Sequence, residues 1–452
     1  MFLACMFSYV IRTNLSIVIV AMVNATAKKG RKGPFCSDLL SNSTKTVIPD
    51  IDERYTWSQQ VQGAILSSYF VGPLLSSVPS GMLAEKFGGA RVAGYATLIP
   101  ALLNLLMPVA AKWHYSVVII LRFLMGFSGV SGPFGAFVTF TLCSLIISSL
   151  GWHAAYYITS ALMLLFWLFW VWLAYDTPDV HPTITDEEKT YIKEQIGSSV
   201  SKQKVALPIV AMATSPPFLV LLWAHFANMW GIYFLSTNGP KYTLEILGLD
   251  MKSGGFLTGL PYIARLGAGA LFAAAGDAIR KRNILSVIWI RKSFMIFSHV
   301  GPGVALLIMT YVECDAVAAM SMMILALALN GAACQTSLQN HQDLAPNFAG
   351  SLYGIMNVFG SVPGFVIPAV VGALTNHRNG IEEWRWMFWI SAVVFFSATV
   401  LFWILGSASI QPWNDYNKSI VTANIGEEEN KINEVNGKEV AVQSEDEENE
   451  RL

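Results

Sequence analysis

Titratable and hydrogen-bonding side chains stand between two long apolar runs at residues 340–346. The stretch reads Asn-His-Gln-Asp-Leu-Ala-Pro and contains His341 and Asp343. A charged group this close to hydrocarbon costs several kcal/mol unless it lines a watery cavity or has a partner. Histidine changes its charge near neutral pH, and a desolvated carboxylate can be brought toward the same range. His341 and Asp343 are therefore candidate coupling groups for an ion gradient, although a loop in which Asp343 simply caps the next helix explains the pattern equally well.

Two arginines lie inside other apolar runs. Arg12 is in the first run, residues 1–23, and Arg122 is the only charged residue between positions 115 and 150. An arginine within a membrane span must face a polar interior, find a counter-charge or extend its side chain to the headgroups. Because an anion that crosses a bilayer needs fixed positive charge near the midplane, we predict that Arg12 and Arg122 bind such a solute.

The composition indicates that these residues are carried by membrane-spanning helices. Hydrophobic residues make up 54% of the 452 residues and charged residues 13%, whereas a soluble domain has about 25% charged residues. The mean hydropathy is +0.49. At about 20 residues for each span, the chain can supply ten to twelve spans, with little left for a soluble domain. We therefore expect an all-α, multi-pass membrane protein embedded in a lipid bilayer.

The apolar runs fall into two groups on either side of a polar connection. We predict an N-terminal helical bundle over residues 1–175, a cytoplasmic linker over 176–215, a C-terminal bundle over 216–408 and a disordered acidic tail over 409–452. Such a tail has too few apolar side chains to fold. The polar loop at 24–57 contains the sequon at Asn42, a predicted glycosylation site if this loop is extracytoplasmic.

Two short loops with glycine and charged residues occupy corresponding places in the two groups. Residues 81–91 resemble the G-x-L-A-D-R-x-G-R-R loop of the major facilitator superfamily, and residues 276–282 form a second, strongly basic copy. In that family the glycines allow a tight turn, and the acid and the bases form a charge clasp that holds one gate. The resemblance thus implies gating roles for Gly81, Glu85, Arg91, Asp277 and Arg280.

Further motifs resemble the anion–cation symporters of this superfamily, which include sialin, the vesicular glutamate transporters and the sodium-phosphate cotransporters. These motifs are Arg-Thr-Asn-Leu-Ser at 12–16, Trp-Ser at 57–58, the stretch at 340–346 and Gln-Pro-Trp-Asn at 411–414. The resemblance implies two pseudo-symmetric helical bundles with eleven or twelve spans. It also supports Arg12 and Arg122 as anion contacts and Tyr233 as a residue of the substrate pocket.

The resemblance implies secondary active symport of inorganic phosphate or a small organic anion with sodium or protons, by alternating access. It further implies a monomer in the plasma membrane or an endolysosomal or vesicular membrane, with no cofactor besides the co-transported ion. No motif of a common enzyme class, metal site or nucleic-acid interface occurs in the sequence, so we expect no catalytic residues. The five cysteines show no C-x-x-C pairing and are interpreted as small core residues, not as disulfides or metal ligands.

The region 115–150 departs from the family pattern. As one helix its residues would extend about 52 Å, against a hydrocarbon core of about 30 Å. The loop and the acidic residue that relatives have here are absent, and Gly129-Val130 stands in place of the acid. Either the region folds as a short re-entrant hairpin, or it crosses once and the total drops to eleven spans. A transport-inactive splice form or incomplete gene model is therefore the alternative to an active symporter.

Overall fold

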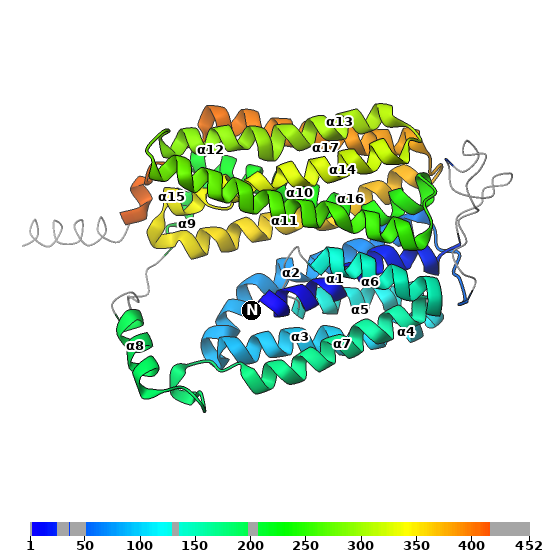
Figure 1. Cartoon of the computed structure of the whole chain (residues 1–452), viewed down its shortest axis with the longest axis horizontal. Helices are drawn as coiled ribbons and strands as arrows, with labels where there is room; N and C mark the ends of the chain where they lie inside the picture. Colours follow the sequence, from blue (N-terminus) through cyan, green and yellow to red (C-terminus); the bar gives the residue numbers. More distant parts are fainter. Residues whose placement is uncertain (1, 25–35, 37–50, 129–134, 198–206, 416–452) are drawn as a thin grey trace, which may run out of the picture.

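Two bodies of packed helices lie side by side in the computed structural model, which describes residues 2–24, 36, 51–128, 135–197 and 207–415 (Figure 1). The linker with α8 joins them at one end. The N-terminal half comprises α1 (Phe2–Met22), α2 (Gln59–Phe87), α3 (Gly89–Leu105), α4 (Met107–Trp113), α5 (Tyr115–Ser128), α6 (Gly135–Leu150) and α7 (Trp152–Leu173). The linker contains the 3-10 turn Pro178–Val180 and α8 (Asp186–Gly197).

The C-terminal half begins with the short α9 (Ile209–Ala213). Its first long segment is α10 (Pro216–Lys241), which the π-turn η2 (Tyr242–Ile246) continues. The second is α11 (Met251–Lys281). The third consists of α12 (Val287–Met295), the π-turn η3 (Ile296–Val300) and α13 (Gly301–Val312). They are followed by α14 (Ala316–Asn330), η4 (Gly331–Gln335), α15 (Asn340–Leu344), η5 (Pro346–Phe348), α16 (Ala349–Thr375), α17 (Ile381–Leu405) and η6 (Pro412–Asp415).

Seven of the described helical segments are long and apolar enough to cross a membrane, or eight if α3 and α4, which meet at 45°, form one span. The described apolar segments Met6–Met22, Tyr115–Phe127 and Gly135–Leu150 are shorter. The 29-residue α2 is long enough to cross but is not among the seven. Adding α1 and α2 to these eight gives ten, and eleven or twelve spans are reached only if the short α5 and α6 are counted as crossings.

The region 115–150 forms two helices, as in the first of the two predicted alternatives. At 1.5 Å per residue, the 14 residues of α5 and the 16 of α6 extend about 21 and 24 Å, less than the hydrocarbon core. α5 begins directly after α4, and α6 ends beside Asp52, next to the first loop. The inner end of α6, at Gly135, packs against Met6 and Tyr9 of α1. Both helices thus enter from the same end of the N-terminal half and stop inside it.

The two halves contact each other closely at the end opposite α8, which we call the closed end. Here α2 packs along α16, α6 along α11 and α1 along α10. A Cβ added at Gly63 would lie 2.5 Å from the carbonyl oxygen of Pro368, so the two backbones are in direct contact. Ser67 Oγ donates to the carbonyl oxygen of Phe365 at 2.8 Å. The buried ammonium group of Lys241 on α10 donates to Gln59 and Gln62 of α2. Polar and backbone contacts therefore join the halves at this end.

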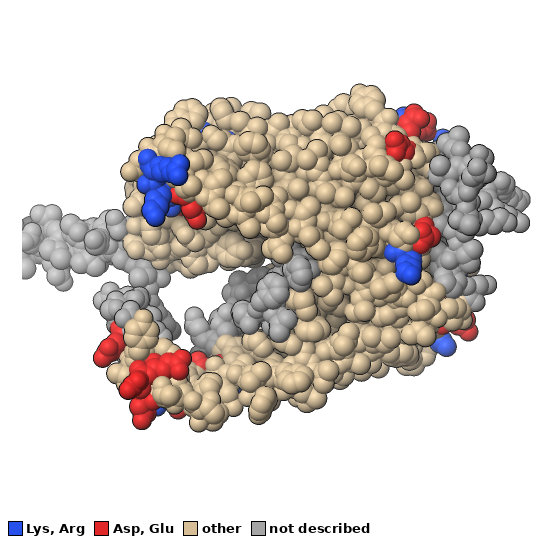
Figure 2. All heavy atoms as spheres, viewed as in Figure 1, with Lys and Arg blue, Asp and Glu red and all other residues tan. Residues whose placement is uncertain are grey.

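At the other end, which we call the open end, the halves separate. Figure 2 shows a hollow between the two bodies that opens on the side where α8 lies. The charged residues visible in this view gather at the two ends of the molecule, whereas the flank between them is almost entirely uncharged. This distribution is typical of a protein whose middle is surrounded by lipid.

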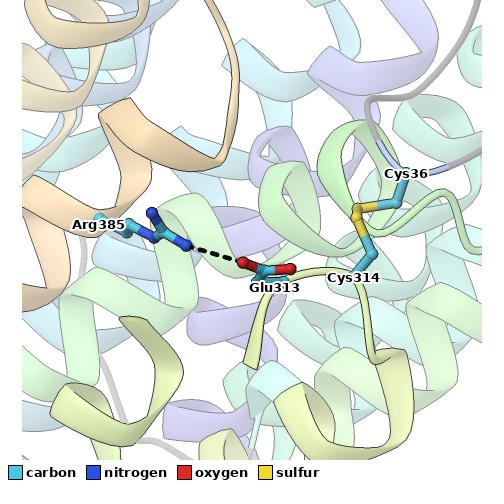
Figure 3. The surroundings of a disulfide bond; sticks show 4 residues. All are labelled: Cys36, Glu313, Cys314 and Arg385. Carbon is cyan, nitrogen blue, oxygen red and sulfur yellow. Dashed lines mark hydrogen bonds and ion pairs between the residues drawn. A yellow bond between two sulfur atoms is a disulfide. The ribbon is translucent and has the colours of Figure 1, made fainter. Parts of the chain in front are cut away.

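A disulfide bond crosses between the halves at the closed end. Cys36, in the loop between α1 and α2, is bonded to Cys314, in the loop between α13 and α14 (Figure 3). The backbone N–H of Cys36 also donates to the carbonyl oxygen of Ile246 at 3.0 Å. The prediction that all five cysteines are simple core residues is therefore wrong for these two, because a pairing over 278 residues leaves no spacing signal. Since disulfides persist in oxidising compartments, the bond favours an extracytoplasmic closed end.

Close packing at Gly364 yields a testable stability difference along α16. A Cβ at Gly364 would collide with the ring of Phe70 on α2, whereas nothing lies within 4 Å of the corresponding position at Gly354. Gly364→Val is therefore expected to destabilise the protein by about 1–3 kcal/mol relative to Gly354→Val, which controls for the change in helix propensity. Thermal unfolding of the two purified variants in detergent measures the difference. Equal melting temperatures would contradict the packing of α2 on α16.

Candidate functional site

Arg12 lies at the junction of the two halves and is surrounded by aromatic rings. Only 6% of the residue is exposed. Its guanidinium carbon is 4.7 Å from the ring centroid of Phe70, 5.2 Å from that of Tyr9 and 4.6 Å from that of Tyr233. Phe70 belongs to α2 and Tyr233 to α10, so the cation is enclosed by both bundles. Electron-rich ring faces stabilise a buried cation, so these rings hold the Arg12 guanidinium in the protein interior.

The neighbours of Arg12 in sequence fix the orientation of α1. Thr13 Oγ1 donates to Thr139 Oγ1 of α6 at 3.1 Å, and Asn14 Nδ2 donates to Asn104 Oδ1 of α3 at 2.9 Å. Successive helical residues point about 100° apart. When Thr13 and Asn14 bind to the N-terminal half, Arg12 is turned toward the other half.

Arg122 is 1% exposed and holds the backbone of α1 beneath Arg12. Its Nη1 donates to the carbonyl oxygen of Ile11 at 3.2 Å and its Nη2 to that of Arg12 at 2.8 Å. Its guanidinium carbon lies 4.7 Å from the ring centroid of Tyr69. Among the described residues no carboxylate forms an ion pair with Arg122. The structure thus brings Arg12, Arg122 and Tyr233 together, and Arg122 adds positive charge while it positions α1.

His341 and Asp343 lie elsewhere, in α15 near the open end of the C-terminal half. The His341 ring stacks on that of Tyr353 with centroids 5.2 Å apart. Both carboxylate oxygens of Asp343 accept from Arg291 of α12, at 2.7 Å from Nε and 3.2 Å from Nη2. The Arg291 side chain is 3% exposed and that of Asp343 11%. Neither His341 nor Asp343 contacts Arg12 or Arg122, and the carboxylate proposed for ion coupling is already bound by a buried cation.

The predicted gating residues lie at the open end, in both halves. Gly81 and Glu85 are in the last turns of α2, where the placement of the Glu85 side chain is outside the described part. Arg91 Nε is 3.8 Å from Asp176, whose carboxylate also accepts from the backbone N–H of Ala90 at 2.6 Å. These contacts stay within the N-terminal half.

In the C-terminal half, Asp277 accepts from Gln335 Nε2 at 3.2 Å, and Arg280 is exposed. No described contact of Arg91 or Asp277 reaches the other half, as expected where the halves are apart. The predicted glycosylation site Asn42 lies outside the described residues.

Some charged residues inside the described helical bundles were not among the predicted site residues. Arg265 of α11 lies on the central face of the C-terminal half, Arg291 binds Asp343, and Lys241 joins α10 to α2. Arg12 was predicted because it is a charged residue within an apolar run, and the same criterion applies to Arg265. Lys241 is the last residue of α10, and Arg291 lies in α12, near the start of the long segment that continues through α13, so both stand near the ends of apolar segments and not in their middle.

Comparison with known proteins decides the family. The family model of the Major Facilitator Superfamily matches residues 1–133 and 125–368. The chain belongs to this superfamily. Sialin from Ovis aries is 30% identical over 435 residues, covering 90% of this chain and 87% of that protein. Vesicular glutamate transporter 2 from Bos taurus is 30% identical over 441 residues, covering 90% and 73%. The predicted kinship with the anion–cation symporter group of the superfamily is thus confirmed.

Solved structures of the superfamily share the fold. A D-xylose–proton symporter superposes with a TM-score of 0.60 at 10% identity, covering 90% of this chain and 97% of that chain. The inward open xylose transporter XylE from E. coli gives 0.58 at 12% identity, covering 89% and 95%. The predicted all-α major facilitator fold is therefore confirmed, and the chain is a multi-pass membrane protein of this superfamily.

Proposed function

We propose that this protein is a secondary active symporter that moves inorganic phosphate or a small organic anion across a membrane together with sodium ions or protons. The membrane is the plasma membrane or that of an endolysosomal or other vesicular compartment. Alternating access to a site between the two halves provides the transport cycle. The proposal assigns no enzymatic activity and treats the monomer as the transporting unit.

The observation that carries this proposal is the buried guanidinium of Arg12 at the junction of the halves. A cation held inside a membrane protein is costly and marks a substrate or ion pathway. The surrounding rings of Tyr9, Phe70 and Tyr233 exclude water, so the attraction between the cation and an anion is stronger than at a surface. Because rings of both halves enclose Arg12, movement of one half against the other changes the side from which the site is reached.

The kinship with sialins and vesicular glutamate transporters supports an anionic substrate. The coupling ion is proposed to act through His341 and Asp343 in the C-terminal half. Since Arg291 binds Asp343, a coupling role for this carboxylate requires that the ion pair opens during the cycle.

Radiotracer uptake into proteoliposomes tests the proposal. Phosphate, sialate, glutamate and urate are offered separately, first with a sodium gradient and then with a pH gradient. We expect at least one anion to accumulate above its equilibrium level under one of the gradients, and we expect empty liposomes to show no such accumulation. If the reconstituted, correctly folded protein accumulates none of the four anions under either gradient, the proposed function is wrong.

A further inference from the structure

A third arginine faces the interface of the two halves from the C-terminal side. On α11, Gly255 and Gly259 pack against Ser144 and Phe137 of α6. One turn further, the Tyr262 ring lies 5.9 Å from that of Phe140, also on α6. Residues three or four positions apart share one helix face. Arg265 therefore continues this face toward the open end, where α11 and the N-terminal half separate.

The Arg265 side chain is held in place but is not neutralised. Its Nε donates to Asn330 Oδ1 of α14 at 3.1 Å. Its two terminal nitrogens make no hydrogen bond, and no carboxylate forms an ion pair with it, within the part of the chain that the structure describes. The residue is only half-buried. A positioned guanidinium with free donors in the membrane interior is suited to a charged ligand that arrives from the hollow.

Tyr9 connects Arg265 with the site at Arg12. Its ring centroid is 5.2 Å from the Arg12 guanidinium carbon, and it is also within electrostatic range of Arg265. The Tyr9 hydroxyl is buried, and in the described residues it has only Ser236 of α10 near it and no well-formed hydrogen bond. A buried hydroxyl without a well-formed hydrogen bond is costly, so a ligand atom that accepts from it is stabilised. Tyr9 also packs against Gly135 at the inner end of α6, the helix on which the Arg265 face of α11 lies, so its hydroxyl is near an arginine of each half.

We propose that Arg12 and Arg265 bind the two negative charges of a small dianion, such as a dicarboxylate, while the Tyr9 hydroxyl donates to it. This inference rests on the proposed function and names the substrate class for the same site. A dianion held by one cation from each half draws the open end of α11 toward α1. Binding thereby favours closure of the hollow, whereas a monoanion satisfies only one of the two arginines.

Glutarate and its monoamide form a matched pair of probes, because they have the same length but two charges and one. We expect purified wild-type protein in detergent to bind glutarate about tenfold more tightly than the monoamide, the difference that one charge-assisted hydrogen bond supplies. Arg265→Gln is expected to weaken glutarate binding by about tenfold and to leave binding of the monoamide within about twofold. Lys252→Gln, an exposed change on the same helix, is the control.

The outcomes separate this inference from the proposed function. Equal affinities of wild type for the two probes would overturn the inference even if Arg265→Gln fails to fold, since that comparison needs no variant. Equal losses for both probes in a folded Arg265→Gln protein would make Arg265 a general structural residue and also overturn it. In both cases measurable anion uptake by wild type would leave the proposed function standing. If the wild-type protein neither binds these probes nor accumulates any test anion, both the dianion inference and the proposed function are wrong.

Discussion

Replacing Arg12 with alanine is expected to lower the initial rate of anion uptake by about 100-fold or more, because the substrate loses its principal buried counter-charge. The rings of Phe70 and Tyr233 remain, but they attract cations and do not bind an anion. The measurement is radiotracer uptake into proteoliposomes that contain equal amounts of folded protein.

Arg378→Ala is the matched control for this experiment. Arg378 is also an arginine of a helical membrane protein, but its side chain is 60% exposed and pairs with Glu382 one helical turn away. Its replacement is expected to leave uptake unchanged, since surface pairs contribute little. Arg12→Lys keeps the charge but loses the planar fork and is expected to retain part of the activity. Full uptake by Arg12→Ala would remove Arg12 from the site.

The second large effect is expected at the ion pair of the C-terminal half. Arg291→Met leaves the Asp343 carboxylate, 11% exposed, without its cation. The substitution also removes Arg291 Nη1, which donates to Gln339 Oε1 at 2.9 Å. Breaking a buried pair by removing one partner costs about 3–5 kcal/mol, so a large fall in thermal stability is expected. Thermal unfolding in detergent measures it.

A double variant separates the contribution of the pair from that of its members. Arg291→Met combined with Asp343→Leu removes both charges and is expected to regain most of the lost stability. Arg385→Met breaks the exposed pair with Glu313 and should change stability by about 1 kcal/mol or less. If the double variant is as unstable as Arg291→Met, the loss of stability does not come from an unpaired buried carboxylate at Asp343. If the folded double variant loses only ion-driven accumulation, Asp343 acts in coupling.

The sequence predicted the membrane-spanning bundles and the central cation, because both depend on local composition. Arg12 stands in an apolar run, and a charge in hydrocarbon has few structural explanations. The same criterion applies to Arg265, which also stands in an apolar run, within the predicted C-terminal bundle at 216–408. Arg265 stands in none of the family motifs, and its place on the helix face toward α6 depends on packing that local composition does not reveal.

Features that depend on contacts between distant residues could not be predicted. The partner of Asp343 is 52 residues away on α12, and the carboxylate seen alone resembled a coupling group. The disulfide of Cys36 with Cys314 spans 278 residues and forms only when the first loop reaches the C-terminal half. In region 115–150, composition allowed one crossing or a hairpin; the structure shows two short helices, α5 packed on α2 and α6 on α1, and the predicted turn at 129–134 lies outside the described residues.

Counterflow tests most directly the central claim that one cationic site is reached alternately from the two sides of the membrane. Proteoliposomes are loaded with an excess of an unlabelled anion that the protein transports and are diluted into a trace of the labelled form. A single site that changes its access exchanges internal for external anion, so we predict a transient accumulation of label above its final level. A smooth approach to equilibrium without this overshoot would indicate a passive pathway and would contradict the account.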